Sequence, residues 1–287
     1  MGVARTLALL SLVLAAPAPA ANLAIQRMAL HQYEDGPVVG ATYEYLPGET
    51  AWFSARLSGY QREKRDDHEG ARLQWEVRAL DPSGLLLEPA QSGRIDERLL
   101  PEDQDWIPKI TMSFTVPSFA PRGVYRIPVT VRDEVAGATV TGELEFHVRG
   151  EEAPDEASFG VRNFRFLARE DDRFALRPAV FQRGGTMFAR FDMVGYKLEE
   201  HNRFWVNYGI AIVDPPPDAE SPEKVLYAQP DALTDTQEPF YPQRWVPGAF
   251  SLNLDADAPT GPHTLVITVR DKLGGGVKEI REAFEVR

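Results

Sequence analysis

The residues best suited to chemistry in this chain are its five histidines and its clustered acids. His31, His68, His147, His201 and His263 stand far apart, and no two have the short spacing at which two imidazoles reach one zinc ion. The chain has no Cys, which excludes thiolate metal sites and thiol nucleophiles. It also has no serine elbow, phosphate-binding loop or dinucleotide fingerprint. The sequence therefore predicts a protein that is not an enzyme and that has no cofactor and no metal centre.

Calcium is the cation that the acidic clusters would suit best, because it binds oxygen ligands. None of the clusters has the spacing of a known calcium loop, and acids also keep exposed loops solvated. Whether calcium binds there stays open at this point. The clusters are Asp66, Asp67 and Glu69; Glu102, Asp103 and Asp105; Asp171 and Asp172; and Glu151, Glu152, Asp155 and Glu156.

Aromatic and charged side chains outside the regular pattern are the candidates for binding. The segment 238–245, EPFYPQRW, places three aromatics among prolines, and Trp52 and Phe188 fall on the polar face of an early strand. Aromatics rimmed by polar groups are typical of protein or sugar contacts, although they also cover sheet edges and domain junctions. The candidate binding residues are Arg62, Lys64, Arg65, Asp66, Asp67, Trp106, Phe240, Tyr241 and Trp245.

The N-terminus and the net charge restrict where the protein works and what it binds. Residues 1–20 have one arginine, an apolar run and small residues before Ala21, which is the order of a cleaved signal peptide. We therefore expect a periplasmic or secreted protein. The formal net charge of −12 disfavours nucleic acid as a partner, and no other stretch is apolar enough to insert into a membrane.

The chain repeats itself. Residues 120–149 align without a gap on 258–287, residues 30–60 align on 166–196, and 73–82 align on 206–215. We predict an internal duplication, with the first domain at 22–149, an acidic linker at 150–157 and the second domain at 158–287. Changes in spacing fall between the aligned blocks, where surface loops tolerate them.

Each repeat is predicted to be made of strands. Apolar residues alternate with polar ones in the rows that begin at Ala51, Leu73, Ile110, Tyr125 and Leu144, and again in the row that begins at Met187. A period of two with one polar face indicates half-buried antiparallel strands. No segment has the apolar face of a helix. The expected fold class is all-β, with two tandem antiparallel β-sandwiches.

Two features resemble the immunoglobulin-like and fibronectin-III-like domains of exported bacterial proteins. Trp75 stands where such domains place a core aromatic, and Gly123-Val124-Tyr125 enters the next strand like their tyrosine corner. Two positions depart from the pattern: the second repeat has His263 in place of Tyr125, and Pro128 lacks the N–H of a ladder residue. That proline is expected at a sheet edge or bulge.

These observations predict a non-catalytic binding or spacer protein of the bacterial cell envelope, with a protein or polysaccharide partner. The alternatives are a carbohydrate-binding accessory protein and an envelope enzyme or inhibitor. If successive strands alternate in direction, every second connection lies at the same end of the sandwich, so the loops 61–72, 88–106 and 133–139 would lie together at one free tip. The same alternation would place the loops 197–204, 228–245 and 271–276 beside the domain junction, and Phe240, Tyr241 and Trp245 between the domains.

Overall fold

The computed structural model describes residues 22–64, 68–153, 158–216 and 221–287. The predicted signal peptide at 1–20, Arg65, Asp66 and Asp67, and half of the predicted acidic linker, 154–157, lie outside these residues. Apart from one short 3-10 turn, η1 (Glu200–Asn202), the described residues form strands, turns and loops, which confirms the all-β class. The duplication itself stays a prediction.

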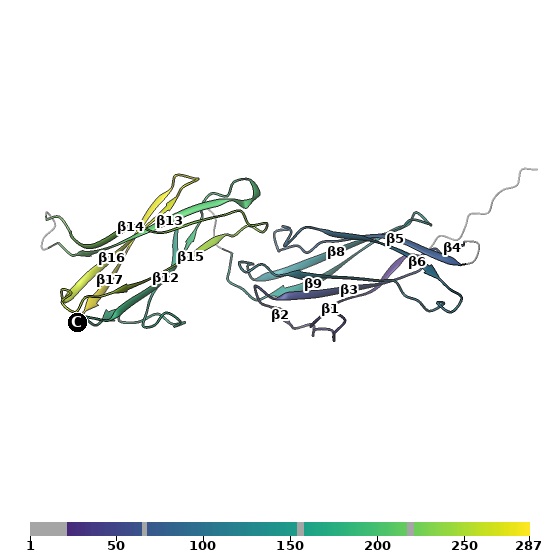
Figure 1. Ribbon diagram of the computed structural model, residues 1–287, viewed down its shortest axis with the longest axis horizontal. Coiled ribbons are helices and arrows are strands. Elements are labelled where there is room, and N and C mark those ends of the chain that lie inside the picture. The colour runs from purple at the N-terminus through teal and green to yellow at the C-terminus, as the bar shows by residue number, and fades with distance from the viewer. Residues whose placement is uncertain (1–21, 65–67, 154–157, 217–220) are drawn as a thin grey trace, which may run out of the picture.

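The described residues before 150 include nine strands, which form two sheets (Figure 1). One sheet has the order β1-β3-β7, and the other has the order β2-β9-β8-β5-β4 with β6 paired to β5. We call this pair of sheets the first sandwich. The strands are β1 (Ala24–His31), β2 (Glu44–Tyr45), β3 (Thr50–Ser58), β4 (Glu63–Lys64), β5 (Glu69–Val77), β6 (Gln91–Leu99), β7 (Lys109–Thr115), β8 (Gly123–Asp133) and β9 (Thr139–Val148).

The second sandwich repeats this plan with eight strands. Its sheets have the orders β10-β12-β15 and β11-β17-β16-β13-β14. The two sandwiches lie end to end along the long axis of the molecule (Figure 1). The strands are β10 (Gly160–Leu167), β11 (Val180–Phe181), β12 (Thr186–Val194), β13 (Phe204–Asp214), β14 (Lys224–Gln237), β15 (Trp245–Asn253), β16 (Gly261–Asp271) and β17 (Val277–Val286).

The predicted inward rows form the cores. Phe53, Leu73, Ile110 and Tyr125 come from both sheets of the first sandwich and are almost wholly buried in one cluster, and Met187 is buried in the cluster of the second. Burying such apolar side chains is the main force that holds two facing sheets together. The domain limits 22–149 and 158–287 stay a prediction beside this arrangement.

The structure corrects several predictions. Residues 91–99 and 228–237, expected in loops, lie in the edge strands β6 and β14. The strand pairs β2–β9 and β11–β17 are parallel, whereas only antiparallel pairing was expected. Pro128 lies inside the central strand β8, neither at an edge nor at a bulge. Its carbonyl accepts the amide of Arg78 just past the end of β5, and pairing resumes at Leu80 and Arg126, so its missing N–H removes one hydrogen bond from this ladder.

Trp75 is half-buried rather than fully buried. Its ring lies against Gly93 of the edge strand β6, where a Cβ atom would come within 2.5 Å of the ring. The largest fully buried aromatics of the two cores are Tyr125 and Tyr208. The Tyr125 hydroxyl donates to the Pro121 carbonyl four residues upstream at 2.6 Å, as a tyrosine corner does.

Candidate functional site

Three connections of the first sandwich meet at the end farthest from the second sandwich (Figure 1). The first connection comprises the described residues 59–64 and 68, the second is 100–108 and the third is 134–138. We call these three connections the tip. The N-terminal segment also reaches this end, because the Gly59 turn lies against Asn22. Gly59 has φ +64°, and a Cβ atom there would lie 2.1 Å from the Asn22 carbonyl oxygen. Only glycine suits that position.

Asp133 fixes one side of the tip. Its Oδ1 atom accepts the amides of Val135 at 2.8 Å and Ala136 at 3.1 Å, and its Oδ2 atom accepts the amide of Gln61 at 2.6 Å. These bonds show that Asp133 folds the turn that follows β8, and the bond to Gln61 joins a second loop to it. Asp271 bonds the amides of Leu273, Gly274 and Lys197 in the same way.

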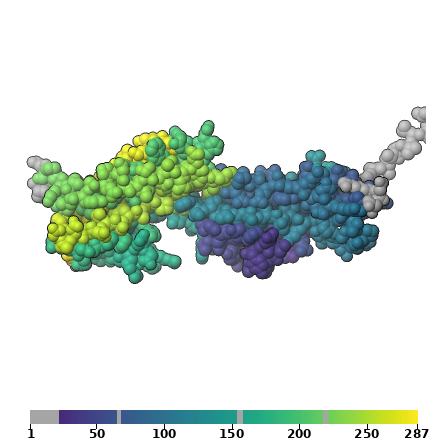
Figure 2. Space-filling view, in the orientation of Figure 1, coloured from purple at the N-terminus to yellow at the C-terminus, as the bar shows by residue number. Residues whose placement is uncertain are grey.

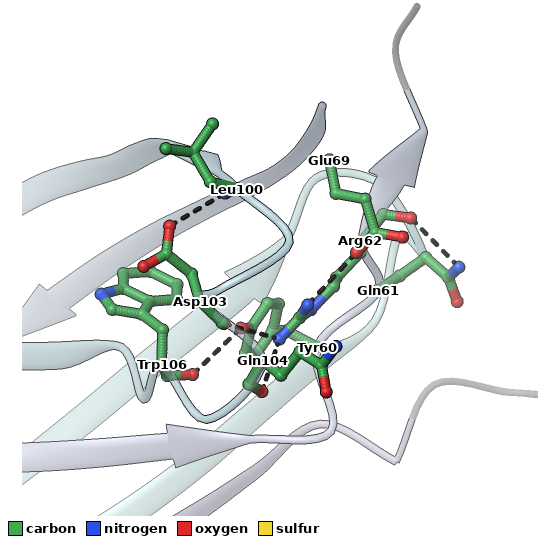
Figure 3. Close-up of polar contacts among 8 residues, drawn as sticks. All are labelled: Tyr60, Gln61, Arg62, Glu69, Leu100, Asp103, Gln104 and Trp106. Atoms are coloured by element: carbon green, nitrogen blue, oxygen red, sulfur yellow. Dashed lines mark hydrogen bonds and ion pairs between the residues drawn. The ribbon is translucent and has the colours of Figure 1, made fainter. Parts of the chain in front are cut away.

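Arg62 fixes the other side of the tip (Figure 3). Its guanidinium pairs with Glu69 at 3.2 Å and donates to the carbonyls of Asp103 at 3.4 Å and Gln104 at 3.0 Å. Burial alone would lower the pKa of Arg62, but its bonds with Glu69 and Tyr60 outweigh that effect and raise it. Its fork of donors holds two loops together, and the prediction that Arg62 contacts a partner stays a prediction.

Trp106 lies beside this clamp and is half-buried. Its ring meets that of Tyr60 edge-on, with centroids 5.9 Å apart, and its carbonyl accepts the Tyr60 hydroxyl at 3.3 Å (Figure 3). The Asp103 carboxylate accepts the Leu100 amide at 2.9 Å, which folds the preceding turn. Leu100 and Ile107 are 41% and 45% exposed on either side. The tip therefore presents apolar side chains on loops that side-chain bonds hold in place.

Lys64 is the only other predicted tip residue that the structure describes. It ends the short strand β4, opposite Glu69, and is exposed. Arg65, Asp66 and Asp67 lie outside the described residues, so the structure brings together only Arg62, Lys64 and Trp106 from the predicted set.

The remaining predicted residues lie at the junction of the two sandwiches. Tyr241, on the loop between β14 and β15, is 6% exposed and joins the core cluster of the first sandwich. Its hydroxyl donates to the buried Asp81 carboxylate at 2.8 Å. Burial first, and the bond with Asp81 second, raise the pKa of Tyr241 far above its usual value. Tyr241 is therefore a structural contact between sandwiches.

Trp245 contributes a second junction contact. It is 6% exposed, its ring meets Phe119 edge-on at 5.6 Å, and the Arg162 guanidinium lies over it at 5.3 Å. Such a cation over an indole face is an attractive contact. Phe240 differs from its two neighbours in being 52% exposed. Of the three aromatics, only Phe240 remains accessible to a partner.

Asp81 is the junction residue that sequence reasoning missed. It is fully buried, and besides Tyr241 it binds the amides of Ser83 and Leu85, each at 2.8 Å. The sequence does contain a signal for Asp81, because the Asp-Pro pair at 81–82 recurs at the equivalent position of the second repeat, 214–215. In the second sandwich, Asp214 instead contacts His263, whose other ring nitrogen lies 2.9 Å from the Pro259 carbonyl oxygen. His263 thereby makes the corner bond that Tyr125 makes in the first.

Among the residues that the structure describes, no three His, Asp or Glu side chains converge as a metal ion would require. The same residues include no helix long and apolar enough to span a membrane.

Comparisons with known proteins assign no family. No family model matches the sequence, and no curated protein matches it. Among solved structures, the Pseudomonas fluorescens alkylpurine DNA glycosylase AlkC, bound to DNA containing an abasic site analog, gives a TM-score of 0.30 at 13% identity, over 47% of this chain and 32% of that one. The C-terminal domain of the Streptococcus agalactiae AgI/II polypeptide BspA gives 0.28 at 12% identity, over 91% and 99%. At these TM-scores neither likeness carries an argument about function.

Proposed function

We propose that this chain is a non-catalytic, exported binding or spacer protein of the bacterial cell envelope that docks a protein partner on its tip. The observation that carries the proposal is the tip itself. Arg62 and Asp133 hold its connections in place, while Leu100, Ile107 and Trp106 present apolar surface beside exposed charged residues. Apolar anchors with a polar rim are typical of protein interfaces.

Preorganisation favours binding at this end. A loop that is already ordered loses little conformational freedom when a partner docks, so more of the contact energy remains as affinity. The opposite end of the first sandwich is covered, because Tyr241 and Trp245 occupy it. The tip is thus the accessible end of the first sandwich. The immunoglobulin-like assignment belongs to this proposal, and the corner bond of Tyr125 supports it.

A cross-linking experiment tests the docking end. A photoactivated cross-linker is placed at Ile107 of the tip or, as a control, at Val225, which is 59% exposed on the second sandwich. In cells that make the protein, we expect a defined cross-linked product from position 107 and none from position 225. Leu100→Asp should abolish that product. No product at position 107, or the same product from both positions, would contradict the proposal.

The site of export has its own test. The mature protein should begin near Ala21 and be recovered in the periplasmic or culture fraction. Mass spectrometry of the purified chain gives the N-terminus directly. A soluble cytoplasmic form that keeps Met1 would refute export without bearing on the tip.

A further inference from the structure

The outer faces of the two three-stranded sheets each contain a hollow of about 190 Å³. In the first sandwich, the first hollow lies over Trp52 of β3, beside Thr111 and Ser113 of β7 and Glu34 of the β1–β2 loop. In the second sandwich, the second hollow lies over Phe188 of β12. These two aromatics are the pair that the aligned repeats place at equivalent positions.

Strand register shows that the two hollows are built alike. Trp52 pairs with His31 on one side and with Ser113 on the other. Phe188 pairs with Leu167 and with Ser251 in the same manner. Both aromatics alternate with core residues and so face outward, where an aromatic side chain gains nothing from core burial.

Hydrogen bonds and an ion pair fix the residues that line the first hollow. His31 Nδ1 lies 2.7 Å from the Gly36 carbonyl oxygen, which can only accept, so this nitrogen donates. In the neutral imidazole, Nε2 then accepts the Ser54 hydroxyl at 2.8 Å. An ion pair between Lys109 and Asp35 fastens the same loop to β7. The loop that carries Glu34 is thereby fixed beside the hollow that Trp52 also lines.

Several polar groups in the hollows have no partner among the described residues. In the first hollow these are the Glu34 carboxylate and the hydroxyls of Thr111 and Ser113. In the second they are Glu170, Arg190 and the Ser251 hydroxyl. An aromatic ring, a free carboxylate and a free serine hydroxyl therefore occur in both hollows. They are Trp52, Glu34 and Ser113 in the first, and Phe188, Glu170 and Ser251 in the second.

This trio selects one class of ligand. A purely apolar group would cover the carboxylate without giving it a hydrogen bond, which is costly. An anion would meet a carboxylate in each hollow, offset by the Arg190 guanidinium in the second hollow alone, and a net charge of −12 over the chain. A sugar ring satisfies both requirements, because its C–H face packs on an aromatic ring while its hydroxyls bond to carboxylate and serine. We propose that the two hollows bind rings of one neutral polysaccharide chain.

The arrangement of the hollows favours a polymer over a single sugar. Figure 2 shows the loop beside the first hollow (purple) and the one beside the second (green) bulging from the same lower edge of the molecule. The junction contacts of Tyr241 and Trp245 link the sandwiches that carry them. Once one ring is bound, a second ring on the same chain is present at high effective concentration.

The test uses the full mature protein on an array of neutral and acidic oligosaccharides of graded length. We expect binding to a class of neutral oligosaccharides, strengthening with length. Trp52→Ala and Phe188→Ala should each weaken binding of the longest members by about 10²-fold, the gain that linkage gives. Glu34→Gln and Glu170→Gln are milder variants, because both side chains are exposed and neither carboxylate has a hydrogen bond or ion pair among the described residues. Each should weaken binding less than the loss of the aromatic ring in the same hollow.

Trp205→Ala is the matched control, since Trp205 is an exposed aromatic (39%) on the second sandwich outside both hollows. It should bind like the unaltered chain. Binding to no oligosaccharide, binding only to acidic ones, or full binding by the Trp52→Ala/Phe188→Ala variant would overturn the proposal. If Trp52→Ala weakened oligosaccharide binding and Phe188→Ala did not, the claim that both hollows bind the chain would be wrong. Cross-linking at the tip is unaffected by these variants, so the two proposals fail separately.

Discussion

Tyr241→Phe removes one hydroxyl and keeps the ring that packs in the first core. The lost bond joins that hydroxyl to the Asp81 carboxylate at 2.8 Å, and both side chains are buried. Hydrogen bonds to charged groups contribute about 1.5–3 kcal/mol. Asp81 keeps the two amides and the Ser83 hydroxyl as donors, so it is not left without partners. We therefore expect a loss of about 1.5–3 kcal/mol, near the value of the bond itself.

Urea denaturation of the mature chain, followed by fluorescence and circular dichroism, measures this loss. Unfolding of either sandwich breaks the junction, so the first transition should lose the full amount. A sandwich that unfolds second has already lost its neighbour, and its transition should not move. At about 1.4 kcal/mol per factor of ten, the population with a broken junction rises about 10- to 100-fold.

Tyr43→Phe is the matched control. The Tyr43 hydroxyl also donates to a carboxylate, that of Glu49 at 3.1 Å, but the pair is exposed. Exposed contacts of this kind contribute less than about 1 kcal/mol. If Tyr241→Phe costs no more than Tyr43→Phe, or shifts both transitions equally, the junction does not depend on the buried bond.

Three further predictions concern the sandwiches themselves. Asp133→Ala and Asp271→Ala each leave three backbone amides without their acceptor, and should each lower the unfolding free energy by about 2–4 kcal/mol in urea titrations; a cost below about 1 kcal/mol would contradict the turn role. Phe53→Ala should lower the unfolding free energy by about 3–5 kcal/mol, and Trp75→Ala should lower it clearly less, because Trp75 is only half-buried. Thermal unfolding measures both losses, and a larger loss for Trp75→Ala would mean that Trp75 is the core aromatic after all. Burial raises the pKa of Tyr45 to about 12, so stability present below about pH 10 should fall as the pH rises from 10 to 12. Tyr45→Phe, assayed over that range, should flatten the fall and leave neutral-pH stability unchanged or higher, because the buried hydroxyl has no partner among the described residues.

Strands with one buried face were predictable from the sequence. The rows at Phe53 and Ile110 alternate because alternate residues enter the core, and both rows form strands of the predicted kind. The edge strand β6, Gln91–Leu99, has mostly polar residues and, among the described strands, pairs with β5 alone, so it leaves no period-two signal. Half-burial of Trp75 follows from that strand, because Gly93 is opposite it.

The candidate site was less predictable for a different reason. The turn role of Asp133 depends on residues two or three positions away, which a sequence shows. The clamp of Arg62 depends on carbonyl groups about 40 residues away, and the bond of Tyr241 joins residues 160 apart. Such contacts are set by how loops meet in space, which residue type and spacing do not encode.

The two parallel strand pairs have a mechanical consequence. The described chain begins at the tip, where Asn22 lies against Gly59, and ends at the far end of the second sandwich (Figure 1). Tension applied between these ends runs through both sandwiches in series. In β2–β9 and β11–β17, one strand lies near the entry of its sandwich and the other near its exit, and each pair joins only two residues on each side. Pulling slides these partners past one another, so all their hydrogen bonds bear the load at once.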